Sequence, residues 1–184
     1  MSPSAYANVE QRTRAWLESF VVGLNLCPFA RPVLAADGLR LTVCESAKLE
    51  DIASMYLQEL DLICHSSESE IATSLLVLPA GLEDFDTYLH FIDNANNLLE
   101  EQGLAGTIQL ASFHPQYQFD DEPEGATSHF TNRSPYPMIH FLREEMMDRV
   151  LQEFPNPEEI PLRNIETLEA MNAAELQQRL DNLL

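Results

Sequence analysis

Three stretches of this chain contain the side chains best suited to chemistry. Cys27 lies in the first, His114 in the second, and His140 in the third, which runs from Thr131 to Arg143. A cysteine can act as a nucleophile, and a histidine can exchange a proton near neutral pH. We therefore take Cys27, His114 and His140 as the candidate catalytic residues.

Polar side chains that suit ligand binding accompany these three residues. Nine of the ten basic residues are arginine, whose guanidinium group binds carboxylate or phosphate through paired hydrogen bonds. Because thirty acidic residues outnumber the basic ones, two arginines in the third stretch indicate a local anion site. The predicted partner is a small anionic molecule. The candidate ligand-binding residues are Asn25, Arg31, Tyr117, Asn132, Arg133 and Arg143.

Each candidate also has a purely structural interpretation. Cys27 precedes a proline and can fill a buried turn as a small hydrophobic residue. His114 can order a loop by bonding backbone carbonyl groups, and Tyr117 can serve packing alone. Arg143 can pair with neighbouring carboxylates, whereas Arg133 has no carboxylate close to it in the sequence. The sequence leaves these alternatives open.

Three classes of function fit these residues. The first is an enzyme in which His114 exchanges a proton, Cys27 attacks, and the arginines hold a carboxylate or phosphate. The second is a metal-binding protein that uses Cys27 and some of the histidines His114, His129 and His140. The third is a module that binds an anionic ligand without turnover. No two of the metal-ligand candidates have the close spacing of a zinc signature, so we assign no metal ligands and identify no cofactor.

Composition excludes some partners. A formal net charge of −20 repels nucleic acid and anionic membrane surfaces. The three cysteines are not closely paired and follow no apolar signal segment, which predicts a cytoplasmic protein with reduced thiols. No apolar run approaches membrane-spanning length. The oligomeric state does not follow from the sequence.

Residue periodicity predicts both strands and helices. Apolar residues at steps of three and four predict helices over residues 4–24, 48–64 and 83–102. Alternation predicts strands over residues 39–44 and 107–113, and the continuous apolar run 75–78 predicts a central strand covered on both faces. Two prolines exclude helix from residues 25–32.

The third chemical stretch is predicted to begin a helix that runs from Ser134 to about Phe154. Ser134 can cap that helix, and Pro135 fits its first turn. On such a helix His140 and Arg143 share one face. Prolines break the chain afterwards, and the remainder forms a helical C-terminal extension of about residues 156–184.

The order strand, helix, strand, helix, strand is typical of right-handed parallel crossovers. It predicts a single α/β domain over residues 1–184, with a small, mainly parallel sheet of at least three strands flanked by helices. Ligands of such sheets lie beyond the carboxyl ends of the strands, where His114 falls. We therefore expect the Cys27 turn, the His114 strand end and the Asn132–Arg143 segment to form one site.

Four runs of sequence resemble a known family. They are GLNLCPFARP, ASFHPQYQF, TNRSPYPMIHFLRE and RNIETLEAM. Over nearly its whole length the chain is similar to the bacterial DUF1415 family, a domain of unknown function. The resemblance implies no particular reaction. It implies that the characteristic positions are Asn25, Cys27, Pro28, Arg31, His114, Pro115, Tyr117, Asn132, Arg133, Pro135, His140 and Arg143.

Overall fold

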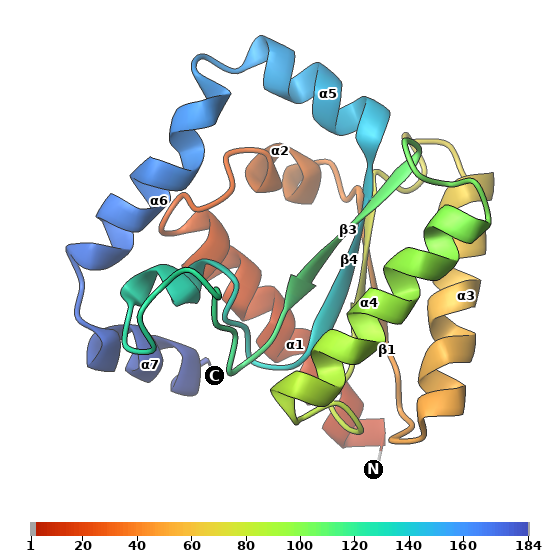
Figure 1. Ribbon diagram of the computed structural model, residues 1–184, viewed down its shortest axis with the longest axis horizontal. Helices are drawn as coiled ribbons and strands as arrows, with labels where there is room; N and C mark the ends of the chain where they lie inside the picture. Colours follow the sequence, from red (N-terminus) through yellow and green to blue (C-terminus); the bar gives the residue numbers. More distant parts are fainter. Residues whose placement is uncertain (1–2, 184) are drawn as a thin grey trace.

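A four-stranded β-sheet between two layers of helices forms the centre of the molecule (Figure 1). The computed structural model describes residues 3–183. Its strands are β1 (Leu39–Val43), β2 (Thr73–Val77), β3 (Ile108–Phe113) and β4 (Met138–Arg143). They lie in the order β1-β2-β4-β3, so β2 and β4 are the inner strands. All residues of β2 are buried, which confirms the prediction of a strand covered on both faces.

The strand directions correct the predicted mainly parallel sheet. The α/β class is confirmed, and β1 and β2 are parallel. However, β4 is antiparallel to both β2 and β3, so two of the three strand pairs are antiparallel. The three predicted strands do run in one direction, but β4 lies between β2 and β3 and pairs with both.

The helix predicted over residues 134–154 was wrong in its first half. Met138–Arg143 form β4 instead, and helix α5 (Glu144–Glu153) begins at the next residue. Ser134 caps no helix, because its hydroxyl donates to the backbone carbonyl of Tyr136 and closes the turn before β4. The prolines that fit a helix start also fit this turn.

Alternate residues of β4 face the two helical layers. Ile139 and Phe141 are fully buried in the apolar core on one face, and His140 lies on the other face. His140 and Arg143 are three residues apart, so in a strand they point to opposite faces. This corrects the prediction that the two residues share one face of a helix.

One face of the sheet packs against α3 (Leu49–His65) and α4 (Phe85–Glu101), which lie side by side in Figure 1. Both helices confirm the predicted elements. The α4 helix begins after Asp84, whose carboxylate accepts the backbone N–H of Thr87. It ends before Gly103, whose φ of 70° permits the left-handed turn that follows a helix.

A second group of helices covers the opposite face of the sheet (Figure 1). The α-helices of this group are α1 (Pro3–Trp16), α2 (Ala30–Ala35), α6 (Ile160–Glu169) and α7 (Ala173–Asp181). The group also contains the π-helix η1 (Leu17–Val22) and the short 3-10 helices η2 (Thr127–Thr131) and η3 (Pro157–Glu159). The predicted first helix is thus an α-helix that continues as a π-helix. Within the described chain, no helix is long and apolar enough to cross a bilayer.

Two details of this layer bear on the predictions. Helix α2 begins at Ala30, which corrects the prediction that prolines exclude helix from residues 25–32. Pro32 lies in its first turn, where the missing N–H costs no intrahelical hydrogen bond. The C-terminal extension is helical as predicted, and the side chain of Asn172 caps α7 by accepting the backbone N–H of Glu175.

Candidate functional site

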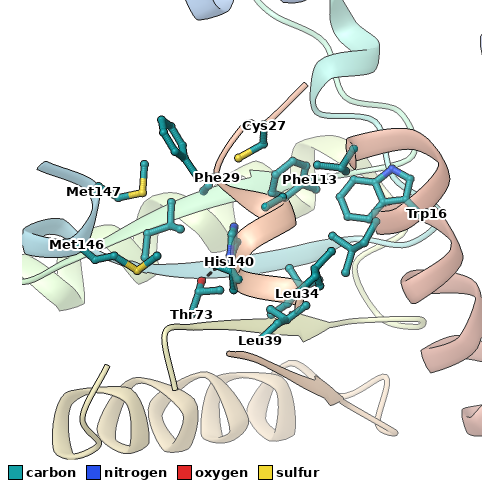
Figure 2. Close-up of a pocket in the computed structure, with 17 residues that line it drawn as sticks. Trp16, Cys27, Phe29, Leu34, Leu39, Thr73, Phe113, His140, Met146 and Met147 are labelled. Atoms are coloured by element: carbon teal, nitrogen blue, oxygen red, sulfur yellow. Dashed lines mark hydrogen bonds between the residues drawn. The ribbon is translucent and has the colours of Figure 1, made fainter. Parts of the chain in front are cut away.

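A mostly apolar cavity of about 200 Å³ lies between the sheet and the helices of the second layer. Its floor consists of strand residues, its walls come from α1, η1 and α2, and α5 closes one side (Figure 2). Thr73 and His140 are polar side chains on the floor, and Cys27 lies on the opposite side. The apolar lining includes Trp16, Phe29, Leu34, Leu75, Phe113 and Met146.

His140 is fixed in this cavity by a hydrogen bond to Thr73. Thr73 pairs with Leu142 in the sheet and His140 pairs with Leu75, so the two residues are diagonal neighbours on one face. Nε2 of His140 lies 2.6 Å from Oγ1 of Thr73, and the same hydroxyl lies 2.7 Å from the backbone oxygen of Phe141. The imidazole therefore projects into the cavity in one defined orientation (Figure 2).

The environment of His140 favours the neutral imidazole. Burial among apolar side chains lowers the pKa of His140 to about 4, because a charged ring would lose its hydration there. The residue is partly accessible, and its side chain lines the cavity. Among the side chains of residues 8–183 and the described backbone, Nδ1 of His140 has no hydrogen-bond partner. At neutral pH this atom is therefore an unused acceptor on the cavity floor.

Cys27 places a thiol in the same cavity. Burial raises the pKa of Cys27, and the backbone N–H groups of Phe29 and Ala30 oppose this effect without outweighing it. The thiol is thus protonated at neutral pH. Cys27 and His140 lie on opposite sides of the cavity, and no hydrogen bond between these two described residues activates the sulfur (Figure 2).

His114 lies at the end of β3, as predicted, but it does not line the cavity. Its ring is fully buried; Nδ1 accepts the backbone N–H of Gln116, and Nε2 donates to the backbone carbonyl of Leu82. Burial lowers the pKa of His114 below its ordinary value. Both nitrogens are occupied, and this geometry matches the alternative in which His114 orders a loop.

His129, in η2, has a similar arrangement. Its Nδ1 accepts the backbone N–H of Phe119, and its Nε2 lies 2.9 Å from the backbone oxygen of Pro123. Among the residues that the structure describes, no group of three or more His, Cys, Asp or Glu side chains is arranged to hold a metal ion. The metal-binding alternative therefore has no assembled donor set in this part of the chain.

Arg143 caps the end of α3. One of its terminal nitrogens donates to the backbone oxygens of Ile63 and Ser66, each at 2.8 Å, and its Nε donates to the backbone oxygen of Ile71 at 3.0 Å. These carbonyl groups lie at the helix end or just beyond it, where intrahelical partners are missing. The guanidinium group thus joins β4 to α3 and to the start of β2.

Arg133 borders a separate, polar depression that Asp84 and Asp86 also line. Its Nε donates to the backbone oxygen of Tyr117 at 3.2 Å, and its guanidinium carbon lies 4.5 Å from the centroid of the Phe130 ring. Burial lowers the pKa of Arg133. Among the described residues no carboxylate forms an ion pair with it. The depression nevertheless combines one cation with two acidic residues.

The remaining candidates serve the fold or face solvent. The side chain of Asn132 donates to the backbone oxygen of Ser112 and ties the η2 segment to β3. Tyr117 packs against neighbouring aromatic rings. Asn25 adopts a φ of 54° after the first helix, a conformation that asparagine tolerates, and its side chain is exposed. Arg31 is exposed on α2.

The expected convergence of the three stretches on one sheet edge is not found. Cys27 and His140 share the cavity, whereas His114 and Arg133 lie outside its lining and Arg143 binds the end of α3. The cavity lies on a face of the sheet, not beyond the carboxyl ends of the strands. Its position follows from β4, which carries His140 between β2 and β3.

Comparison with known proteins supports one assignment. Residues 8–178 match the family described as "Protein of unknown function (DUF1415)". The chain belongs to the DUF1415 family. This confirms the resemblance that the four sequence runs indicated. No curated protein and no solved structure matches the chain.

Sequence reasoning missed two residues that shape the cavity of this DUF1415 protein. Thr73 fixes the His140 ring, and Ala111 leaves space beside it in the neighbouring strand. Thr73 lies two residues before the apolar run 75–78. That run predicted the strand, but it did not include Thr73, the first residue of the strand. A correct prediction of β4 as a strand would have identified Thr73, because the pairing of β4 with β2 places Thr73 beside His140.

Proposed function

We propose that this DUF1415 protein binds a small, largely apolar organic molecule in the cavity beside His140. The cavity carries the proposal, because its lining is almost wholly apolar and its volume is about 200 Å³. In another protein an apolar cavity of roughly 150 Å³ stays dry and binds benzene. A ligand of one aromatic ring or two fused rings therefore matches the space between the sheet, α2 and α5.

The sequence predicted an anionic ligand, but the cavity lining lacks the cationic side chains that would bind one. The lining contains no arginine or lysine, and a buried carboxylate or phosphate without a counter-charge is strongly destabilised. Arg133 borders the other depression, but Asp84 and Asp86 share it and oppose an anion there. Arg143 already donates to backbone carbonyl groups. The apolar cavity is therefore the better-supported binding site.

Two groups in the cavity can react with a bound molecule. The free Nδ1 of His140 is unprotonated at neutral pH and can accept a hydrogen bond, but a pKa of about 4 makes it only a weak base in proton transfer. Cys27 can act as a nucleophile only after its thiol loses a proton, and burial opposes this loss because it raises the pKa of Cys27. We therefore propose ligand binding as the primary function and assign these two residues the chemical roles in any turnover.

A cavity-filling substitution tests the proposal. Ala111 lines the cavity and is paired with His140, so Ala111→Leu places a larger side chain in the ligand's space. We expect indole to raise the melting temperature of the wild-type protein and of Ala35→Leu, a matched exchange at an exposed position of α2. Ala111→Leu should lose this response. Equal binding to all three proteins, measured by calorimetry, would place the ligand elsewhere.

A further inference from the structure

The hydrogen bonds around Thr73 determine where the proton of His140 lies. A hydroxyl group has one proton, and Oγ1 of Thr73 contacts two groups, at 2.7 Å and 2.6 Å. The first is the backbone oxygen of Phe141, which can only accept, so the Thr73 proton points to it. Nε2 of His140 must then donate to Oγ1. Because a neutral imidazole carries one N–H, Nδ1 bears only a lone pair.

That lone pair is an accessible hydrogen-bond acceptor on the cavity floor, whereas the unpartnered indole N–H of Trp16, another lining residue, is itself buried. No donor among the described groups reaches Nδ1, and most surrounding side chains are apolar, such as Phe29, Phe113 and Met146. A water molecule bound there would lack most of the partners that buried water normally has. An apolar ligand that covers Nδ1 would bury this acceptor without a partner, which is unfavourable, so a ligand that donates to it gains more than one that does not.

We infer that the cavity selects an uncharged ligand with one hydrogen-bond donor, an aromatic N–H or a hydroxyl group, which donates to Nδ1 of His140. This inference rests on the proposed function and specifies its ligand class. An apolar ligand without a donor leaves Nδ1 unpaired. A ligand that offers only an acceptor places two lone pairs face to face, and an anion adds a charge for which the lining holds no counter-charge. The Thr73 hydroxyl enforces this preference because it prevents the ring from presenting an N–H instead.

Three fused-ring probes of nearly equal shape separate the inference from the proposed function. Indole carries an N–H donor, 1-benzofuran carries an acceptor oxygen in its place, and indene carries neither. Isothermal calorimetry on the wild-type protein is expected to show indole binding about tenfold more tightly than 1-benzofuran, the size of one net hydrogen bond. Equal affinity for all three would overturn the inference and leave the proposed function standing. Binding of none would overturn both.

The substitution Thr73→Val tests the role of the hydroxyl. It keeps the shape of the side chain but releases Nε2, so the ring can carry its proton on either nitrogen. We expect the preference for indole over 1-benzofuran to fall to within about twofold. The matched control is Thr167→Val, which removes a threonine hydroxyl that bonds within α6, away from the cavity. An unchanged preference in Thr73→Val would contradict the inference.

A measurement on the wild-type protein makes the test independent of how well Thr73→Val folds. Nitrogen-15 NMR distinguishes a protonated from an unprotonated imidazole nitrogen. We expect His140 to have a protonated Nε2 and an unprotonated Nδ1, and indole to shift the Nδ1 signal more than indene does. A protonated Nδ1 in the free protein would overturn the assignment, as would equal shifts with indole and indene.

Discussion

The Ser74 hydroxyl donates a hydrogen bond of 2.7 Å to the Glu59 carboxylate and so joins β2 to α3. The same carboxylate accepts hydrogen bonds from Arg40 and Thr42 on β1. Burial raises the pKa of Glu59, but the hydrogen bonds from Arg40 and Ser74 outweigh burial and hold the pKa below its usual value. Glu59 is thus a buried charge with a full set of partners.

We predict that Glu59→Ala lowers the free energy of unfolding by about 3 kcal/mol, because it leaves the Ser74 hydroxyl buried without its acceptor. The cost is limited because the Arg40 side chain is 41% exposed and can turn to solvent. Glu68→Ala is the control; it breaks a surface ion pair with Arg149 and should cost less than about 1 kcal/mol. Urea denaturation followed by circular dichroism measures both values. Equal losses of unfolding free energy in Glu59→Ala and Glu68→Ala would contradict the prediction.

Arg143 is predicted to stabilise the fold without affecting ligand binding. Arg143→Ala leaves the carbonyl groups of Ile63, Ser66 and Ile71 without their charged donor and should lower the free energy of unfolding by about 2 kcal/mol. Arg143→Lys should restore only part of this loss, because an ammonium group cannot reproduce the planar fork. Arg31→Ala, at an exposed position, should cost less than about 0.5 kcal/mol. A large loss of indole affinity in Arg143→Ala would contradict this assignment.

The contrast between β2 and β4 shows how far the sequence determines the fold. The run Leu75–Leu78 identified a central strand, because a short apolar segment stopped by a proline is too short for a typical helix. Met138–Arg143 is also a short apolar segment, but α5 follows it directly and Ser134 precedes it. A turn and a helix start use the same residue types, so local pattern did not separate them. Pairing with β2 and β3, a tertiary effect, decided the outcome.

The sequence predicted only part of the candidate site, because the site also depends on contacts between distant segments. A search for reactive side chains selected Cys27 and His140, which do share a cavity. It also selected His114, whose polar groups are satisfied inside the fold. Residue type shows what a side chain can do, whereas its partners depend on contacts between distant segments. The floor residue Ala111 has no reactive group, and its contribution is the space that its small side chain leaves.

His140 is predicted to make the protein less stable in acid. The pKa of His140 is about 4 in the folded protein, because burial disfavours its charged form, and about 6.5 in an unfolded chain. As the pH falls through this window the unfolded chain takes up the proton first, so stability present above about pH 6.5 is lost toward about pH 4. This residue should contribute a loss of about 2 kcal/mol between pH 7 and pH 4.5.

Comparison with His140→Gln isolates this contribution from that of the carboxylates. Glutamine can still donate to Thr73, but it does not titrate. The unfolding free energy of His140→Gln should therefore fall less steeply with acid than that of the wild type. Identical slopes in wild type and His140→Gln, from urea titrations at each pH, would contradict the prediction.

Cys27 provides a chemical report on the occupancy of the cavity. Its thiol lines the cavity, so bound indole should block the approach of a small alkylating reagent such as iodoacetamide. At a free indole concentration about nine times the Kd, the alkylation rate of Cys27 should fall about tenfold, in proportion to the unoccupied fraction. Burial raises the pKa of Cys27 and slows the reaction, so the measurement belongs near pH 8.5, where more thiolate is present.

Cys64 serves as the internal control for this experiment. It is also partly accessible, burial also raises its pKa, and it lies outside the cavity lining. Mass spectrometry of the digested protein measures alkylation at both cysteines in one sample, and indole should leave the rate at Cys64 unchanged. Ala111→Leu should remove the protection of Cys27, because the leucine side chain occupies the space that indole needs. Equal slowing at both cysteines, or unprotected Cys27 in protein saturated with indole, would show that the ligand does not bind beside His140.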